Sequence, residues 1–418
     1  MRKLTTNILA DPVWSKVAVL SSILFFILVA DAILSDWVPV YMQNVLGGPL
    51  LMGLVMSFSS LIGLGADFVF PQLLSGTTVR KLVLLAIVTG LVFCFVLLVT
   101  TLIPAGDSWW TVLALLLVAM AAWGIYYEFL GFASQQFVAE TAGPHQRSSV
   151  WAVMGIFKNL AYFLGPILGG VLVTRGDRTV LLVAGLISAV AYIFLLFFKL
   201  HNRPVVVEIE HINLKAEMSH WWVLMRHVWP MLLVSLMLGL VDATFWTTGT
   251  VLTESLSQKN WWGGLFLPMY TLPSLFVGVF VLRWGIYQGK KKWAETFMFL
   301  GGIFLMLLFR EGSIFYELTM VLLASTMLSV SYPLVDAVYS DIVFRMGRER
   351  KHLMGLSNSM VSMAYIIGPI LSGLIASLVG ERLTFVVMGL LMSVMAVFLL
   401  LVTPRKLKLP QTEIATWG

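Results

Sequence analysis

The sequence predicts an all-α polytopic membrane protein with twelve transmembrane helices in two pseudo-symmetric six-helix bundles. Hydrophobic residues make up 59% of the 418-residue chain and charged residues 11%. Apolar runs long enough to cross a bilayer recur along the whole chain, and short repeats relate its two halves. A soluble core cannot enclose so many apolar side chains, so lipid must surround much of the protein.

The twelve expected spans follow from the length of the apolar runs, since a membrane-crossing helix needs about 20 predominantly apolar residues. These runs lie at 17–41, 50–73, 82–104, 111–139, 150–173, 180–199, 228–252, 262–284, 294–309, 314–344, 354–379 and 383–403. They predict an N-terminal bundle over residues 1–200, a cytoplasmic linker over 201–227, and a C-terminal bundle with a cytoplasmic tail over 228–418. Within the linker, the spacing of Ile209, Ile212 and Ala216 suits either a short amphipathic helix or a solvated connection.

Charge distribution predicts the orientation of the spans. An even number of spans puts both termini on one side, and most of the 27 Lys and Arg residues fall on that side. The positive-inside rule therefore places both termini in the cytoplasm of a cell whose plasma or inner membrane holds the protein. The net charge of +6 reflects this topology, so we expect no nucleic-acid partner, and we expect a monomer.

A repeated glycine-proline motif links spans five and eleven. Span five contains Gly165-Pro166-Ile-Leu-Gly169-Gly170, and span eleven contains Gly368-Pro369-Ile-Leu-Ser-Gly373. Small residues allow close helix approach, and proline weakens the helical hydrogen-bond ladder. Two interpretations stay open, namely plain helix packing and a conformational hinge.

These features resemble the major facilitator superfamily over nearly the whole chain. The GPxxGG run is similar to the antiporter motif of the drug/proton exchangers, and Pro144-His-Gln-Arg147-Ser148 is similar to the loop between their spans four and five. The loop between spans two and three is degraded, since only the basic pair Arg80-Lys81 remains and Ser75 stands where the family has an acid. The resemblance implies a secondary active transporter that works by alternating access.

Five ionisable residues lie deep inside predicted spans, where each costs several kcal/mol and is a functional candidate. They are Asp31, Glu128, Lys158, Asp242 and Asp336. Asp31 follows Lys16, and Asp242 follows His227, at the same spacing, which puts both acids about 22 Å from the cytoplasmic boundary. Glu128 and Lys158 share a similar depth in consecutive spans, so we expect an ion pair that is either a static brace or a gate.

Asp31 and Asp242 are the leading candidates for proton coupling, with Glu128 and Asp336 beside them. A carboxyl group in a low-dielectric setting can exchange a proton near neutral pH. The alternative is that each acid only hydrogen-bonds to a neighbouring helix. Asp67 is a weaker candidate because it has no counterpart in span eight.

Aromatic residues near these acids suggest a substrate cavity. Trp37, Tyr127 and Trp246 could bind an amphipathic cation by cation–π contact, with Glu128 and Lys158 also lining the site. For each aromatic residue, contact with lipid or a neighbouring helix is the alternative.

Motifs of other protein classes are missing from the sequence. No GxxxxGKS/T, HExxH, CxxC or GxSxG stretch appears, so we expect no ATPase, metal site, membrane enzyme or cofactor. The favoured prediction is a proton-coupled antiporter that exports amphipathic or cationic small molecules. Two alternatives remain: uptake, exchange or lipid flipping of an anionic or polar substrate held by Lys158, and a sensor or scaffold that does not transport.

Overall fold

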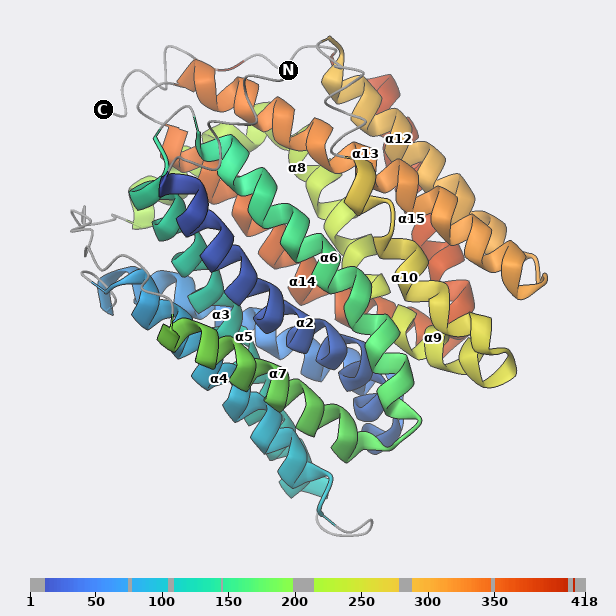
Figure 1. Cartoon of the computed structure of the whole chain (residues 1–418). Coiled ribbons are helices and arrows are strands. Elements are labelled where there is room, and N and C mark those ends of the chain that lie inside the picture. Colours follow the sequence, from blue (N-terminus) through green and yellow to red (C-terminus); the bar gives the residue numbers. More distant parts are fainter. Residues whose placement is uncertain are drawn as a thin grey trace, which may run out of the picture. The chain divides into compact units, whose positions relative to one another are not determined.

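The structure is a computed structural model that describes residues 12–73, 77–103, 109–143, 146–197, 214–277, 288–346, 350–404 and 409. Every regular element in these ranges is a helix (Figure 1). Eleven of the helices described there are long and apolar enough to cross a membrane. The chain forms two compact units, one of residues 1–46 and 58–209 and the other of residues 47–57 and 210–418.

The first unit is built from six helices, with the first residues of α3 assigned to the second unit. They are α2 (Pro12–Leu46), α3 (Pro49–Leu73), α4 (Val79–Thr100), α5 (Trp109–Thr141), α6 (Arg147–Val173) and α7 (Asp177–Phe197). Helix α2 packs against α6 and α7, and α4 packs against α5 and α7, as Figure 1 shows for α2 beside α6. The sequence predicted these six spans to within a few residues at most ends.

The second unit repeats this packing with more interrupted helices. Its elements are α8 (Leu214–Phe245), α9 (Thr248–Lys259), η1 (Trp261–Leu265), α10 (Phe266–Thr271), α12 (Lys290–Met306), η2 (Leu307–Phe309), α13 (Ile314–Met346), α14 (Arg350–Val379) and α15 (Glu381–Val402). Helix α8 packs against α14, while α12 packs against α13 and α15. These contacts are the counterparts of α2 with α6 and of α4 with α5 and α7.

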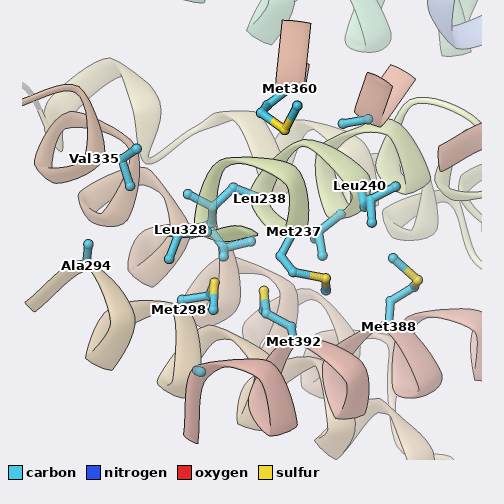
Figure 2. Close-up of a cluster of buried hydrophobic side chains, with 14 of the residues drawn as sticks. Met237, Leu238, Leu240, Ala294, Met298, Leu328, Val335, Met360, Met388 and Met392 are labelled. Carbon is cyan, nitrogen blue, oxygen red and sulfur yellow. The ribbon is translucent and has the colours of Figure 1, made fainter. Parts of the chain in front are cut away.

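The core of the second unit is rich in methionine. Met237 of α8, Met298 of α12 and Met392 of α15 are buried and gather near the centre of the cluster in Figure 2. Methionine is unbranched and polarizable, so it fills irregular gaps between helices that meet at different angles. The cluster therefore joins the first, third and sixth spanning helices of this unit.

Matching turns add to the evidence for an internal repeat. Gly176 ends the connection from α6 to α7 with a φ of 99°, and Gly380 does the same from α14 to α15 with a φ of 88°. A side chain is strained in this left-handed region, so glycine suits a chain that leaves one helix and starts the next within a few residues.

The structure corrects two expectations about the middle of the chain. Helix α8 begins at Leu214, so residues 214–227 of the expected linker are helical and only 201–213 lie outside the described residues. The seventh span is also broken, because α8 ends at Phe245 and α9 begins at Thr248. The expected eighth span is described only as far as Val277, which leaves the count of twelve as a prediction.

Candidate functional site

The Asp31 carboxylate is a buried polar group of the first unit. It is 4% exposed and lies in α2. Trp123 Nε1 donates to its Oδ1 at 2.8 Å, while the hydroxyls of Tyr127 and Tyr162 donate to its Oδ2 at 2.9 and 2.8 Å. A carboxylate has about four acceptor positions, so three neutral donors from α5 and α6 nearly saturate it.

Asp242 has an equivalent environment in the second unit. It lies in α8 and is half-buried, and its Oδ1 and Oδ2 accept from the hydroxyls of Tyr270 and Tyr365 respectively. Tyr332 lies near the same carboxylate, and its hydroxyl donates to the Leu238 carbonyl oxygen at 2.9 Å. Each unit thus surrounds its deep aspartate with tyrosine hydroxyls.

One of these tyrosines belongs to the repeated motif. Tyr162 and Tyr365 each stand three residues before the Gly-Pro pair, in Ala-Tyr-Phe-Leu-Gly165-Pro and Ala-Tyr-Ile-Ile-Gly368-Pro. The sequence comparison began at the glycines and missed both tyrosines. Extending it by four residues would have found this signal.

The glycines of the motif allow the first and fifth helices of each half to touch. A side chain on Gly165 would meet the Ala32 Cβ at 2.2 Å, and one on Gly368 would meet the Ala243 Cβ at 2.6 Å. These alanines directly follow the two aspartates. We call each set of contacts an acid–tyrosine module. In the first module, Asp31 and Ala32 of α2 contact Tyr162 and Gly165 of α6. In the second module, Asp242 and Ala243 of α8 contact Tyr365 and Gly368 of α14.

The remaining motif glycines differ between the halves. A Cβ on Gly169 would lie 2.8 Å from Asp36 Oδ2, whereas one on Gly170 would meet nothing within 4 Å. At the position equivalent to Gly169, Ser372 hydrogen-bonds to Thr247 at 3.0 Å. A Cβ on Gly373 would meet the Pro49 carbonyl oxygen at 2.3 Å. Close packing at these positions is confirmed except at Gly170, while a hinge at Gly165-Pro166 and Gly368-Pro369 stays a prediction.

The expected ion pair between Glu128 and Lys158 does not form. Glu128 instead turns toward α3, where a side chain on Gly63 would lie 2.9 Å from its Oε1 and where Asp67 is near enough to interact with it. Helix α5 packs mainly against α4 and contacts α6 only slightly, so equal depth does not make the two side chains face each other. Asp67 therefore matters more than the sequence suggested.

Lys158 is exposed and points along α6 toward the Asp31 site. Its Nζ lies 5.9 Å from the centre of the Tyr162 ring, and its charge is near enough to interact with that of Asp31. No carboxylate of the described residues lies within ion-pair distance of it. The ammonium group is thus available for binding beside the Tyr162 ring.

The other predicted site residues lie apart from this arrangement. Trp37 is 2% exposed, donates to Asp177 Oδ1 at 2.7 Å and stacks on Tyr41, so it joins α2 to α7. Trp246 is half-buried in the break between α8 and α9, and the Asp336 side chain is exposed on α13. Of the predicted aromatic residues, Tyr127 contacts a predicted proton-coupling acid, since its hydroxyl donates to Asp31.

Basic residues that the sequence predicts to face the cytoplasm have different contacts in the two halves. In the first, Arg80 and Lys81 form no ion pair within the described ranges, and Arg147 Nε donates to the Ala142 carbonyl oxygen at 3.4 Å. A neutral contact lies nearby, from Gln136 Nε2 to the Thr77 carbonyl oxygen at 2.9 Å.

In the second half, acids from the helices replace the acid that the loop lacks. Lys290 pairs with Asp341 of α13 at 2.7 Å, and Lys291 pairs with Glu295 one turn along α12 at 2.9 Å. Lys291 also donates to Thr403 at the end of α15. Lys291 and Glu295 are 7% and 2% exposed at their side chains, so this is a buried ion pair that sequence spacing alone did not distinguish from a solvated one.

Long apolar helices in a repeated arrangement, with polar groups enclosed at mid-depth, define an integral membrane protein of the transporter type. A profile of the Major Facilitator Superfamily matches residues 2–163, 128–254 and 231–417. The chain therefore belongs to the Major Facilitator Superfamily, and it is a membrane transporter of a small-molecule substrate rather than an enzyme.

Solved structures share this fold at low sequence identity. The peptide transporter POT in complex with sulfate aligns with a TM-score of 0.71 and 14% identity, over 93% of this chain and 94% of that one. The nucleoside transporter NupG aligns with a TM-score of 0.67 and 12% identity, over 91% of this chain and 98% of that one. The human organic anion transporter MFSD10 (TETRAN) aligns with a TM-score of 0.62 and 19% identity, over 93% of this chain and 100% of that one. No curated protein matches the sequence significantly.

Proposed function

We propose that the protein is a proton-coupled secondary active transporter that works by alternating access, with Asp31 and Asp242 as its proton-carrying groups. The observation that carries this proposal is the acid–tyrosine module, which occurs once in each half at the same place in the repeat. Ionisable groups inside membrane spans are costly, so two enclosed aspartates at matched positions favour a functional role over a packing role.

Protonation would change the module in a definite way. The Oδ2 atom of Asp31 now accepts hydrogen bonds from both Tyr127 and Tyr162. When one carboxylate oxygen gains a proton it becomes a donor, so at least one of the three donors around Asp31 has to turn away. Because Tyr162 belongs to α6 and Tyr127 to α5, the charge of one carboxyl group can alter contacts among three helices.

The two aspartates support a cationic substrate less strongly than the sequence suggested. Both aspartates already accept hydrogen bonds from neutral donors, which leaves little of either carboxylate for a cationic substrate. Lys158 is the exposed charge beside the first module. This observation favours the alternative in which Lys158 holds a substrate with an anionic group. The direction of transport stays a prediction.

Proton flux in proteoliposomes tests the coupling. Compounds that thermally stabilise the purified protein are added outside the vesicles while an internal dye reports pH. We expect flux with the wild type, and we expect Asp31→Asn and Asp242→Asn to bind the same compounds with reduced proton flux. Coupling that is unchanged in both variants, or no flux with any stabilising compound, would refute the proposal.

Accessibility measurements separate a transporter from a scaffold. Single cysteines are placed along α6 and α14 in a Cys94→Ala background and labelled from each side of the membrane. In an alternating-access cycle, positions facing the pathway become reactive from each side in turn, and the balance shifts when a stabilising compound is added. Reactivity fixed to one side under all conditions would favour the scaffold hypothesis.

A further inference from the structure

Lys158 stands out because no carboxylate in the described part of the chain forms an ion pair with it, at a depth where a charge needs a partner. It lies within α6, eleven residues after Arg147, which corresponds to about 16 Å along the helix. Its side chain is exposed, and within the described ranges no Asp or Glu oxygen lies within ion-pair distance. An ammonium group in this position has to meet water or an anion, since lipid would not solvate it.

A short chain of contacts connects Lys158 to Asp31. Lys158 and Tyr162 are one turn apart on α6, with the ammonium group 5.9 Å from the ring centre. Tyr162 in turn donates to Asp31 Oδ2 at 2.8 Å. The other titratable groups around Asp31 in the described part of the chain are Tyr126 and Tyr127 of α5 and Cys94 of α4, so Lys158 is the one cation among them.

The second module lacks this cation. The repeat that aligns Tyr162 with Tyr365 aligns Lys158 with Val361, which is 47% exposed on α14. The two positions thus share exposure and place in the motif but differ in charge. This difference makes Val361 a matched internal control for Lys158.

We propose that Lys158 binds an anionic group of the substrate, such as a carboxylate, sulfonate or phosphate monoester, and thereby links substrate binding to protonation of Asp31. While Lys158 is free, its charge favours the ionised carboxylate. A bound anion cancels that charge, so Asp31 binds a proton more tightly. Binding linkage is reciprocal, so the proton also tightens binding of the anion.

The sign of this linkage fixes the coupling mode. An anion and a proton that promote each other's binding are carried together, which makes the transporter a symporter. A cationic substrate would compete with the proton and give an antiporter. The inference rests on the proposed function for its consequence in transport, but the linkage itself can be measured without turnover.

Infrared spectroscopy of the full-length protein in nanodiscs measures the linkage at its source. The carboxylic acid bands of Asp31 and Asp242 are assigned with Asp31→Asn and Asp242→Asn. We expect Lys158→Gln to increase proton affinity at Asp31 roughly tenfold, the size of effect expected for unit charges several ångströms apart in a partly buried site. Lys158→Arg should keep the wild-type affinity, and the Asp242 band should stay unchanged.

A gain of charge in the second module gives the reverse experiment. Val361→Lys should weaken proton binding at Asp242 and leave Asp31 unaffected. If Lys158→Gln leaves the Asp31 band unchanged, or if Val361→Lys leaves the Asp242 band unchanged while the protein stays folded, the electrostatic link is refuted.

The anion itself is tested by thermal stabilisation with matched probes. Aromatic carboxylates, sulfonates and phosphate monoesters are compared with ammonium analogues of the same carbon skeleton, for example 1-naphthylacetate with 1-naphthylmethylammonium. We expect at least one anion to stabilise the wild type and Lys158→Arg but not Lys158→Gln, and to increase proton binding at Asp31. Stabilisation by none of the anions, or equally by their cationic analogues, would overturn the assignment.

These results are distinguishable from those that test the proposed function. An infrared shift without proton flux in proteoliposomes would refute coupled transport and leave the linked anion site intact. Flux without any shift would refute the anion site and leave proton coupling intact.

Discussion

Asp31 and Asp242 occupy equivalent places in the two halves, but different helices supply their hydrogen-bond donors. In the first half, α5 contributes Trp123 and Tyr127, whereas in the second half α10 contributes Tyr270. The common partner is the tyrosine of the Gly-Pro motif. The repeated element is therefore the contact between the first and fifth helices, and the remaining donors differ between the two modules.

The largest expected difference between the halves concerns proton transport. Asp31 has a cation beside it and a nearly complete shell of donors, so Asp31→Asn should reduce coupled flux by about 100-fold, within the usual range for loss of a proton-transfer group. Asp242→Asn should reduce it less if only the first module is linked to substrate. Initial rates of dye-reported proton flux measure both variants, and an equal loss would show that the modules act as one unit.

The next largest difference is expected between two ion pairs at the start of α12, because one is buried and the other is more exposed. Glu295→Ala should destabilise the protein by about 3 to 5 kcal/mol, because it leaves Lys291 buried without its counterion. Asp341→Ala, which breaks the more exposed pair with Lys290, should cost less than about 1 kcal/mol. Thermal unfolding in nanodiscs compares them, and similar losses would mean that Lys291 finds another partner.

Helix contact at the motif glycines predicts a smaller effect. Gly165→Ala places a methyl group against Ala32 and should cost about 1 to 3 kcal/mol by overpacking. Gly170→Ala is the matched control, since it has open space around it and should be neutral or slightly stabilising. A melting temperature lowered equally in both variants would show that the contact with Ala32 does not determine the result.

The smallest effect is expected from the shared tyrosines. Tyr162→Phe and Tyr365→Phe each remove one hydroxyl donor, which should cost about 1 kcal/mol. The two losses should be similar, because each variant keeps another tyrosine hydroxyl on its aspartate, from Tyr127 at Asp31 and from Tyr270 at Asp242. A double-mutant cycle with the neighbouring aspartate measures each contact, and a coupling energy near zero in both halves would contradict the module.

Much of the fold could be predicted from the sequence, because the length of an apolar run can be read from neighbouring residues alone. The boundaries of α3, α6 and α15 lie close to those expected from their apolar runs. The break after Phe245 could not be predicted in this way, since Trp246 and Thr247 are apolar enough to continue a span. The start of α8 at Leu214 was missed because its first turns are polar.

The site was predicted less completely, for a geometric reason. Depth along a helix follows from residue counting, and it located Asp31 and Asp242 correctly as a matched pair. The direction in which a side chain points depends on how helices are rotated, which residue counting does not give. For that reason the contact of Glu128 with α3 and that of Trp37 with Asp177 were not predicted, while a substrate-binding role for Trp37 stays a prediction.

The break in the seventh span places the second aspartate close to a helix end. Helix α2 continues past Asp31 as far as Leu46, whereas α8 ends at Phe245, one turn after Asp242. The last backbone carbonyl groups of a helix have no intrahelical partner. Polar backbone groups therefore lie within about one turn of the aspartate in the second half, while in the first half the helix continues past it.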